Sequence, residues 1–389
     1  MTLRILHLAD VHLDRAFAGV GAYGEVAHRR REGLREALRR AGEAARRLSC
    51  DAVTIGGDLY EHERAGPQTG AFLAELFSSW QPARVFLAAG NHDACLPGSV
   101  LLRTEWPDNV HVFTEPELQP VVLGDGVTLW GLSHRDPAWT GDPLDCPPVG
   151  GEGGVHLALF HGAELGSRPA NKSIHGPFHA EHIRERGFTL ALCGHYHRRR
   201  LDAAIGLVYP GSPEPLTFDE EGDRGPVLVE IDGGGRVRLE GLVTNRWHAR
   251  QFECDIDGAE GAAQIYESIR RAAVETMRGL GAGRRVAPER TMLRLTLRGE
   301  VAAEVNVDAS VVEATITDAT GAAVVRVRDL SRPSVDIAGA TSDLTTRGEF
   351  TRAMLTELES EQDPSRRAIV EDALRYGLQA LSDVEVGLR

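Results

Sequence analysis

The chain has 389 residues, of which 42% are hydrophobic and 26% are charged, a composition typical of a globular protein with two or three domains. This composition excludes a fibrous or an intrinsically disordered chain. The formal net charge of −14 argues against a protein that binds nucleic acid through a basic surface of its own.

The first residues favour a strand and lack the basic start and the apolar core of a signal peptide. No stretch of 18 apolar residues is present, so we expect no membrane span. The five cysteines are scattered and form no CxxC pair, which is typical of a protein in reducing surroundings. We therefore expect a cytoplasmic protein.

The first ninety residues predict alternating strands and helices. Apolar runs at 3–9, 51–57 and 84–89 are typical of buried strands, and helices are expected between the first two runs and at 68–80. Because a crossover helix joins parallel strands, the first two strands should be parallel. Ligands of such sheets bind at the carboxyl ends of the strands.

The first of these helices is rich in arginine. Between Arg29 and Arg47 eight arginines stand against three glutamates, a local balance of +5. We interpret this stretch as a solvated helix face.

From residue 108 onward, short strands follow one another with few helices between them. They are expected at 110–113, 120–123, 127–132, 155–160, 188–193, 207–209, 227–231 and 237–242. Proline and glycine over 136–154 predict a long surface loop. This order favours a second sheet packed on the first, with helices outside both.

A domain boundary is expected near Asn245, so that residues 1–245 form the first domain. The next domain, 246–340, is predicted to be α+β. Its expected elements are strands at 250–256, 292–298, 311–317 and 323–327 and a helix at 259–280.

A C-terminal helical segment, 341–389, should contain helices at 346–360 and 364–382. The second helix carries an apolar stripe that docks either on the body of the protein or on a partner. The stripe consists of Ile369, Ala373, Leu374, Leu378 and Leu381.

Five short segments carry most of the metal-binding chemistry of the chain, and each lies at or just past the end of an apolar run. In order they are Asp10-Val11-His12, Gly57-Asp58, Gly90-Asn91-His92-Asp93, His161-Gly162 and Gly194-His195-Tyr196-His197. Any one of them is a weak signal. Together they predict a site for two divalent cations and a metal-dependent phosphoester hydrolase.

The expected metal ligands are Asp10, His12, Asp58, Asn91, His161, His195 and His197. Asp10 and His12 should face the same side of an extended chain, and so should His195 and His197. Asp58 follows two glycines that allow a tight turn, and its two oxygens suit a bridge between the cations. A shell of Asp, Asn and His without thiolates favours Mn²⁺, Fe²⁺ or Zn²⁺.

His92 is the imidazole that the metals do not need. It is adjacent to Asn91, and Gly90 permits the chain to turn so that the two neighbours serve different partners. We expect His92 to stabilise or protonate the departing oxygen.

These segments resemble the motifs of the calcineurin-like metallophosphoesterase superfamily, D-x-H, GD, GNH[ED], H and GHxH. The resemblance implies a four-layer α/β/β/α sandwich in which His92 is the catalytic histidine. It also implies two metal sites that share Asp58. One consists of Asp10, His12, Asp58 and His197, and the other of Asp58, Asn91, His161 and His195.

More narrowly, the chain is similar to the SbcD-type DNA repair exonucleases, bacterial relatives of the double-strand-break nuclease. The likeness lies in ILHLADVHLD at 5–14, GGDLY at 56–60 and YPGSP at 209–213, and it covers 1–245 better than the remainder. It implies a Mn²⁺-dependent nuclease at DNA ends whose 246–340 part is a capping, DNA-binding domain. It also implies an SMC-type coiled-coil ATPase as partner and a homodimer through the helix at 68–80 and residues 96–103.

Glu61 stands where archaeal and eukaryotic relatives carry a histidine implicated in exonuclease action, so the polarity of digestion stays open. We expect Glu61 to contribute to substrate binding. Arg198 follows the last expected ligand directly and, with the two arginines after it, is placed to meet substrate phosphates.

Two other functions are compatible with the same residues. A small-molecule phosphodiesterase, acting for example on cyclic nucleotides, shares the chemistry, but the long C-terminal half counts against it. A non-catalytic scaffold that binds DNA ends is the second, and the complete ligand set counts against it.

Overall fold

The structure is a computed structural model that describes residues 2–124, 126–149, 153–168, 172–259, 261–281, 286–302, 305 and 307–381. It separates into two compact units, Met1–Ala249 and Arg250–Arg389, and each is described by itself. Over the described ranges, none of the helices has the length and hydropathy needed to cross a membrane.

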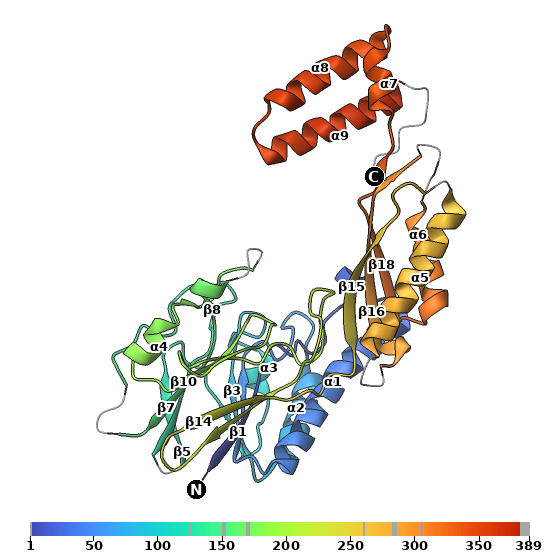
Figure 1. The fold of residues 1–389 in the computed structure, drawn as a ribbon. Coiled ribbons are helices and arrows are strands. Elements are labelled where there is room, and N and C mark those ends of the chain that lie inside the picture. The colour runs from blue at the N-terminus through green and yellow to red at the C-terminus, as the bar shows by residue number, and fades with distance from the viewer. Residues whose placement is uncertain are drawn as a thin grey trace. The chain divides into compact units, whose positions relative to one another are not determined.

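Unit 1 contains two six-stranded sheets packed face to face (Figure 1). The first has the order β14-β13-β1-β2-β3-β4. Its strands are β1 (Leu3–Leu8), β2 (Ala52–Gly56), β3 (Arg84–Ala88), β4 (Val110–Val112), β13 (Val227–Ile231) and β14 (Val237–Gly241). Strands β1 to β4 are parallel, which confirms the prediction for the first two, and β13 pairs with β1 in the antiparallel sense.

Helices α1 (Gly24–Arg47) and α2 (Pro67–Ser78) lie on the outer side of this sheet (Figure 1). The prediction that the arginines of α1 form a solvated face is wrong for Arg30, which is fully buried. Its guanidinium lies 4.4 Å from the ring centroid of Phe17 and 4.5 Å from that of Trp247. A planar, weakly hydrated guanidinium stacks on aromatic rings in this way, and periodicity alone does not reveal such partners.

The second sheet has the order β11-β12-β10-β7-β6-β5. Its strands are β5 (Gln119–Gly124), β6 (Val127–Gly131), β7 (Val155–His161), β10 (Leu190–Gly194), β11 (Arg200–Asp202) and β12 (Leu207–Tyr209). The four inner strands are parallel, and β5 and β11 join as antiparallel edges. The sequence did not predict β11.

Short elements complete unit 1. They are α3 (Val100–Arg103), α4 (Glu181–Glu185), β8 (Ala163–Glu164), β9 (Pro177–Phe178) and 3-10 helices at Ala18–Val20 and Leu165–Ser167. The predicted 136–154 loop contains no helix or strand in its described part, and residues 150–152 lie outside the described residues.

The main core of unit 1 lies between the two sheets. Ile5 and Phe86 of the first sheet pack with Leu157, Leu190 and Leu192 of the second, and all five are buried. Helix α4 and the loops around it cover the outer side of the second sheet (Figure 1). The predicted α/β/β/α sandwich is therefore confirmed, with a fourth layer that is mostly loop.

Replacing Leu157 with alanine should lower the free energy of unfolding by about 2–5 kcal/mol, because the side chain is fully buried between the sheets and its loss leaves a cavity. Equilibrium denaturation in urea measures this change. Val122→Ala, at a side chain of strand β5 that is 67% exposed, is the matched control and should stay within about 0.5 kcal/mol of the wild type. Equal effects at both positions would contradict the assignment of the core.

Unit 2 contains a three-stranded sheet of β15 (His248–Asp255), β16 (Thr291–Arg298) and β18 (Val324–Asp329). Helices α5 (Ala262–Leu280) and α6 (Ala309–Thr320) pack on this sheet through a core that includes Ile265, Leu293 and Ile316. A two-stranded sheet of β17 (Glu300–Val301) and β19 (Arg332–Pro333) and a 3-10 helix at Pro288–Arg290 accompany them.

The predicted strand at 311–317 is wrong, because these residues belong to α6. Their β-branched side chains favour a strand by local propensity. Asp308, however, caps the helix by accepting a hydrogen bond from the Ser310 N–H at 2.7 Å, and Gly321 ends it in the left-handed conformation. Strands β16 and β18 are parallel, so their connection has to be a crossover, which α6 provides.

Helices α7 (Ile337–Ser342), α8 (Thr346–Ser360) and α9 (Pro364–Ala380) follow. In the predicted stripe, Leu374 and Leu378 are buried against Ala340 and Leu358 of the neighbouring helices. Ile369 is 67% exposed. The stripe therefore packs largely within this group of helices. Ser382, the predicted end of α9, lies outside the described residues, and a separate domain over 341–389 stays a prediction.

Candidate metal centre

Five parallel strands of unit 1 end at one place, and the predicted ligands follow these ends. Strands β1, β2 and β3 belong to the first sheet, and β7 and β10 belong to the second. Hydrogen bonds join the two sheets here. The His195 N–H donates to Asp10 Oδ1 at 2.8 Å, and His161 Nδ1 donates to the Gly56 carbonyl at 2.9 Å.

The expected extended backbone at the two paired motifs is wrong. Strand β1 ends at Leu8, and Asp10 and His12 have φ angles of 55° and 52°. Strand β10 ends at Gly194, and His195 and His197 have φ angles of 121° and 27°. These side chains converge because the chain turns through conformations that are costly for residues with a Cβ, as is common at functional sites.

His12 and His197 face each other with their Nε2 atoms 3.2 Å apart. A carboxylate lies behind each ring. His12 Nδ1 donates to Glu61 Oε1 at 3.0 Å, and His197 Nδ1 donates to Glu220 Oε1 at 2.9 Å. A carboxylate only accepts hydrogen bonds, so it places the ring proton on Nδ1 and leaves the Nε2 lone pair facing the centre.

His161 and His195 form a second pair, with His161 Nε2 and His195 Nδ1 3.3 Å apart. The other nitrogen of each ring donates to a carbonyl, His161 Nδ1 to Gly56 and His195 Nε2 to Ser173 at 3.0 Å. Burial lowers the pKa of His195 to about 2, so this ring is neutral and able to bind a metal.

Asp58 lies between the two pairs. Its Oδ2 is 3.5 Å from His12 Nε2 and 3.3 Å from His161 Nε2, and its Oδ1 accepts the His92 N–H at 2.9 Å. Burial opposes the charged form, but His161 and His12 hold the pKa of Asp58 well below its usual value. Asp58 in turn outweighs the burial of His161 and raises the pKa of that imidazole to about 9.

The residues present fit a cluster of divalent cations. Asp10 Oδ2 and Asn91 Oδ1 are buried and have no hydrogen-bond partner among the described residues, which is costly unless another group binds them. Ligand atoms of Asp10, His12, Asp58 and His197 all lie within 4.8 Å of one another. The four imidazoles, Asp58 and these two oxygens thus form a nitrogen and oxygen ligand set without thiolates.

His92 borders this cluster, and its side chain is 41% exposed. Its Nδ1 lies 2.8 Å from Glu61 Oε2, and its ring centroid lies 4.7 Å from that of His12. Burial lowers the pKa of His92, but the hydrogen bond to Glu61 and the charge of Asp58 outweigh it and raise the pKa. With Nδ1 engaged, Nε2 is the ring atom left to meet a substrate.

Glu61 holds His12 with one oxygen and His92 with the other, and Arg15 Nη1 lies 3.3 Å from Oε1. Both oxygens therefore have protein partners, and a direct substrate contact by Glu61 stays a prediction. Burial opposes its charged form, but the two histidines lower the pKa of Glu61.

The three arginines after His197 differ in their surroundings. Arg199 Nη2 donates to the carbonyls of Gly225 and Leu242 at 2.7 Å each, and Arg200 Nη1 donates to Glu164 at 2.9 Å. Arg198 is exposed, and its guanidinium has no hydrogen bond or ion pair with any residue that the structure describes. Of the three, Arg198 is the one with a free guanidinium.

Two carboxylates that orient this site were not predicted. Asp93 is fully buried and accepts the N–H groups of Asp58, Leu59 and Gly90 at 3.0, 2.7 and 2.6 Å. Asp93 belongs to one of the five predicted segments, but no role was predicted for it. Its position directly after His92 is the sequence feature that could have indicated one. Glu220 follows His197 by 23 residues in a loop, and nothing in the sequence marks it.

Residues 3–199 match the family of calcineurin-like phosphoesterases, and this range is about half of the chain and contains every residue of the cluster. The chain belongs to the calcineurin-like phosphoesterase family.

Relatives of this phosphoesterase include the uncharacterized metallophosphoesterase YhaO of Bacillus subtilis, 27% identical over 242 residues that cover 60% of this chain and 58% of the relative. The DNA double-strand break repair protein Mre11 of Methanopyrus kandleri is 28% identical over 306 residues, which cover 70% of this chain and 63% of that protein. The chain thus spans less than two thirds of either length. A crystal structure of a dimetal phosphatase from Danio rerio matches 62% of this chain and 96% of its own, with 13% identity and a TM-score of 0.41.

Proposed function

We propose that this phosphoesterase is a DNA nuclease that hydrolyses phosphodiester bonds at DNA ends with two divalent metal ions, Mn²⁺ foremost. The observation that carries the proposal is the position of Asp58 Oδ2, 3.5 Å from His12 Nε2 and 3.3 Å from His161 Nε2. One carboxylate oxygen thereby lies beside one nitrogen from each of two imidazole pairs, and these nitrogens face inward, which favours two ions over one.

The first ion would be held by Asp10, His12, Asp58 and His197, and the second by Asp58, Asn91, His161 and His195. Bound there, such ions lower the pKa of a coordinated water and neutralise charge on the phosphate. Glu61 and Glu220 keep the His12 and His197 rings in the ligating tautomer.

His92 would act on the leaving group. As the oxygen of a water molecule that has lost one proton to solvent bonds to phosphorus, the bond from phosphorus to the ester oxygen breaks, and His92 Nε2 donates its proton to the departing oxygen. Glu61, 2.8 Å from His92 Nδ1, stabilises the protonated ring before that transfer and orients it.

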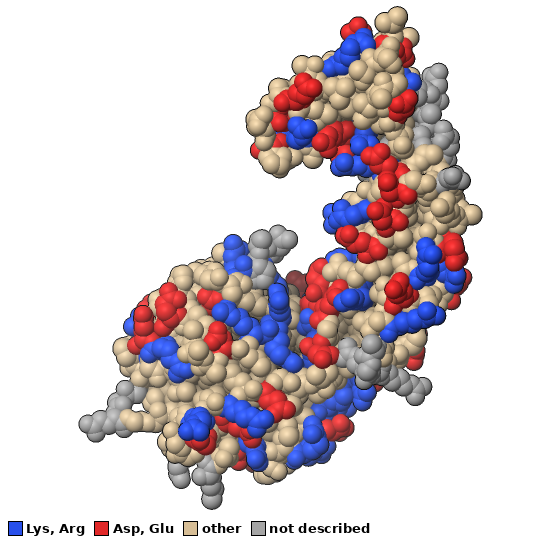
Figure 2. Space-filling view, viewed as in Figure 1, with Lys and Arg blue, Asp and Glu red and all other residues tan. Residues whose placement is uncertain are grey.

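DNA is the proposed substrate because the likeness to Mre11 extends past the metal cluster. The alignment covers 70% of this chain, whereas unit 1 accounts for 249 of 389 residues, or about 64%, so residues of unit 2 take part in it. Despite the net charge of −14, basic side chains are interspersed with acidic ones over the visible face (Figure 2). Arg198, with its free guanidinium beside His197, is the proposed contact to a phosphate.

Purified protein tests the proposal when it is supplied with Mn²⁺ and end-labelled linear duplex or single-stranded DNA. We expect shortened DNA and released nucleotides, loss of activity with EDTA, and poor turnover of cyclic AMP. Turnover of cyclic AMP without cleavage of DNA would instead indicate a small-molecule phosphodiesterase. Bound metals without cleavage of either substrate would favour a DNA-end-binding scaffold.

The partners proposed for this nuclease are an SMC-type coiled-coil ATPase and a second copy of the chain. The support is the resemblance in the motifs, together with the similarity to a repair protein. Co-purification with a long coiled-coil ATPase tests the first partner. Light scattering of the wild type and of a variant changed at Leu102, which is 44% exposed on α3, tests the homodimer.

A further inference from the structure

The connection between β12 and β13, residues 210–226, contains neither a helix nor a strand, yet it buries several polar side chains. Ser212, Glu214, Glu220 and Arg224 are all at most 8% exposed. Buried polar groups on irregular backbone need fixed partners. The partners lie at two places, the metal ligand His197 and the chain segment that leads into unit 2.

The later part of this loop holds His197 by both its ring and its backbone. Glu220 Oε1 accepts from His197 Nδ1 at 2.9 Å, while Glu220 Oε2 accepts the Leu216 N–H at 2.9 Å. Arg224 Nη1 donates to the His197 carbonyl at 2.7 Å, and Arg224 Nε donates to the Glu220 carbonyl at 2.8 Å. The orientation of the imidazole therefore depends on where the loop lies.

The earlier part of the loop is fixed through Glu214, which is fully buried. Its carboxylate accepts the backbone N–H of Arg246 at 3.0 Å and that of Trp247 at 2.9 Å. It also accepts a hydrogen bond from the guanidinium of Arg40 on α1. One residue later, the Pro215 carbonyl accepts from Arg30, the buried arginine of the same helix.

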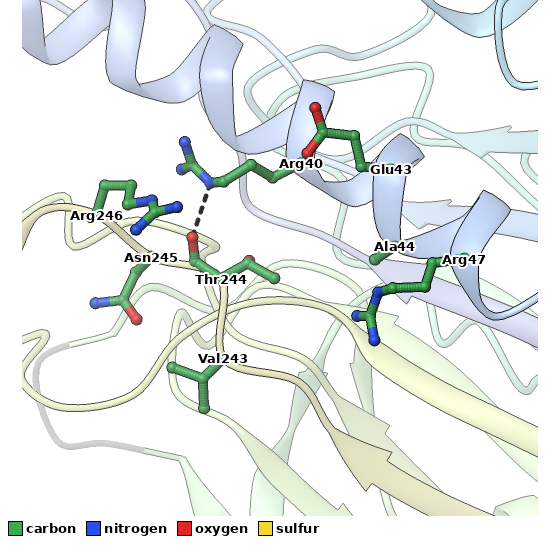
Figure 3. Close-up of a pocket in the computed structure, with 8 residues that line it drawn as sticks. All are labelled: Arg40, Glu43, Ala44, Arg47, Val243, Thr244, Asn245 and Arg246. Carbon is green, nitrogen blue, oxygen red and sulfur yellow. Dashed lines mark hydrogen bonds between the residues drawn. The ribbon is translucent and has the colours of Figure 1, made fainter. Parts of the chain in front are cut away.

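The segment 243–246 faces α1 across a cavity and is joined to this helix by a hydrogen bond. A cavity of about 370 Å³ lies between them, lined on the helix side by Arg40 and Arg47 and on the segment side by Thr244 and Arg246. Figure 3 shows Arg40 reaching from α1 to this segment, where its Nε donates to the Thr244 carbonyl at 2.8 Å.

Trp247 marks the other end of the segment and is closely packed. Its ring lies over Arg30, and a Cβ on Gly33 of α1 would stand 2.7 Å from its Nε1, so only glycine leaves room for the indole. Strand β15 begins at the next residue, His248, and continues into unit 2 from Arg250. The two N–H groups held by Glu214 therefore stand directly before the strand that enters unit 2.

We infer that Glu214 is a positioning residue for His197, which ties the segment entering unit 2 to the loop that orients this imidazole. The path runs from the N–H groups of Arg246 and Trp247 through Glu214 to Glu220 and His197. The inference rests on the proposed function in that His197 holds a metal ion. It adds that the state of the junction segment influences occupancy of that one ion.

The test is a titration of the metal-free full chain with Mn²⁺ in competition with a chelating dye, which reads affinity without turnover. In Glu214→Gln an amide NH₂ replaces one acceptor oxygen, so the three donors around it cannot all be satisfied. We expect the affinity for one ion to fall about 10-fold, while the affinity for the other ion stays the same. This is the lower end of the loss, about 10–100-fold, that is typical when a residue that hydrogen-bonds to a metal ligand is replaced. Glu220→Gln should weaken the same ion by about 10–100-fold.

Glu43→Gln is the matched control, because Glu43 is an exposed carboxylate of α1 beside the same cavity. It should leave both affinities unchanged. Glu214→Asp keeps both acceptor oxygens and should restore part of the lost affinity. If Glu214→Gln does not fold, as judged by circular dichroism, Arg40→Met removes one of the donors to Glu214 and should weaken the same ion by a smaller factor.

Nitrogen NMR of the histidine rings supplies a second readout. In the wild type and in Glu43→Gln, His197 should show one tautomer with the proton on Nδ1, and in Glu214→Gln a mixture of tautomers. A folded Glu214→Gln protein with wild-type metal affinities and a single His197 tautomer would overturn this inference but not the proposed function. A wild type that binds fewer than two ions would overturn the proposed function and the inference with it.

Discussion

Asp58→Asn is expected to lower phosphoester hydrolysis by about 10³-fold or more and to weaken the binding of both metal ions. Asp58 Oδ2 is the carboxylate oxygen that lies within 3.5 Å of an inward-facing nitrogen from each imidazole pair. The amide of asparagine has nearly the same shape, but it carries no charge and offers a single acceptor oxygen. The charge that is proposed to hold both ions is therefore lost while the side-chain volume is kept.

Metal content after dialysis, measured by mass spectrometry, and hydrolysis of bis(p-nitrophenyl) phosphate check this expectation together. Asp136→Asn is a suitable control, because Asp136 is an exposed carboxylate in the loop after β6 and should leave both readouts unchanged. An Asp58→Asn protein that keeps two ions at wild-type affinity would show that Asp58 does not bridge them.

His92→Ala is expected to lower the rate of DNA cleavage by about 10²–10⁴-fold while both metal ions stay bound. The ring borders the cluster, its Nδ1 is engaged by Glu61, and its Nε2 is left for the substrate. The variant therefore lacks the proposed proton donor and keeps the expected ligands. The loss should be smaller with bis(p-nitrophenyl) phosphate, because p-nitrophenolate leaves without needing a proton.

The rate constant kcat on both substrates and the metal content of the same preparation measure this outcome. His28→Ala, at an exposed histidine of α1, controls for the loss of an imidazole outside the site. Metal loss in His92→Ala would place His92 among the ligands, and equal defects on the two substrates would remove its role as an acid.

The predicted parallel pairing of the first two strands shows how local sequence patterns can place residues of the site. Two apolar runs with a helical pattern between residues 9 and 51 predict two strands joined by a crossover helix. A crossover helix joins parallel strands, and β1 and β2 are parallel. Parallel strands have their carboxyl ends at the same edge of the sheet. Asp10, Asp58 and Asn91 could therefore be expected near one another. The match to calcineurin-like phosphoesterases agrees with this fold.

The same local patterns failed at α6. The β-branched residues of 311–317 favour a strand when taken alone. Because β16 and β18 pair in parallel, the residues between them form a crossover helix. This pairing joins residues about 30 positions apart, such as Met292 and Val324. Propensity acts on neighbours in the chain, whereas sheet pairing is settled by distant partners.

The sequence by itself determined which side chains are candidates for the chemistry and which strand ends bring them to one edge, because residue type and hydrophobic period are properties of short stretches. Only the tertiary structure determined how these side chains are oriented. The positive φ angles of Asp10 and His12, the carboxylate of Glu220 behind His197 and the contact of Glu214 with the segment before β15 all depend on chain segments far apart in sequence. Such contacts form when the folded chain buries polar groups that must find partners, and no local pattern records which partner each group meets.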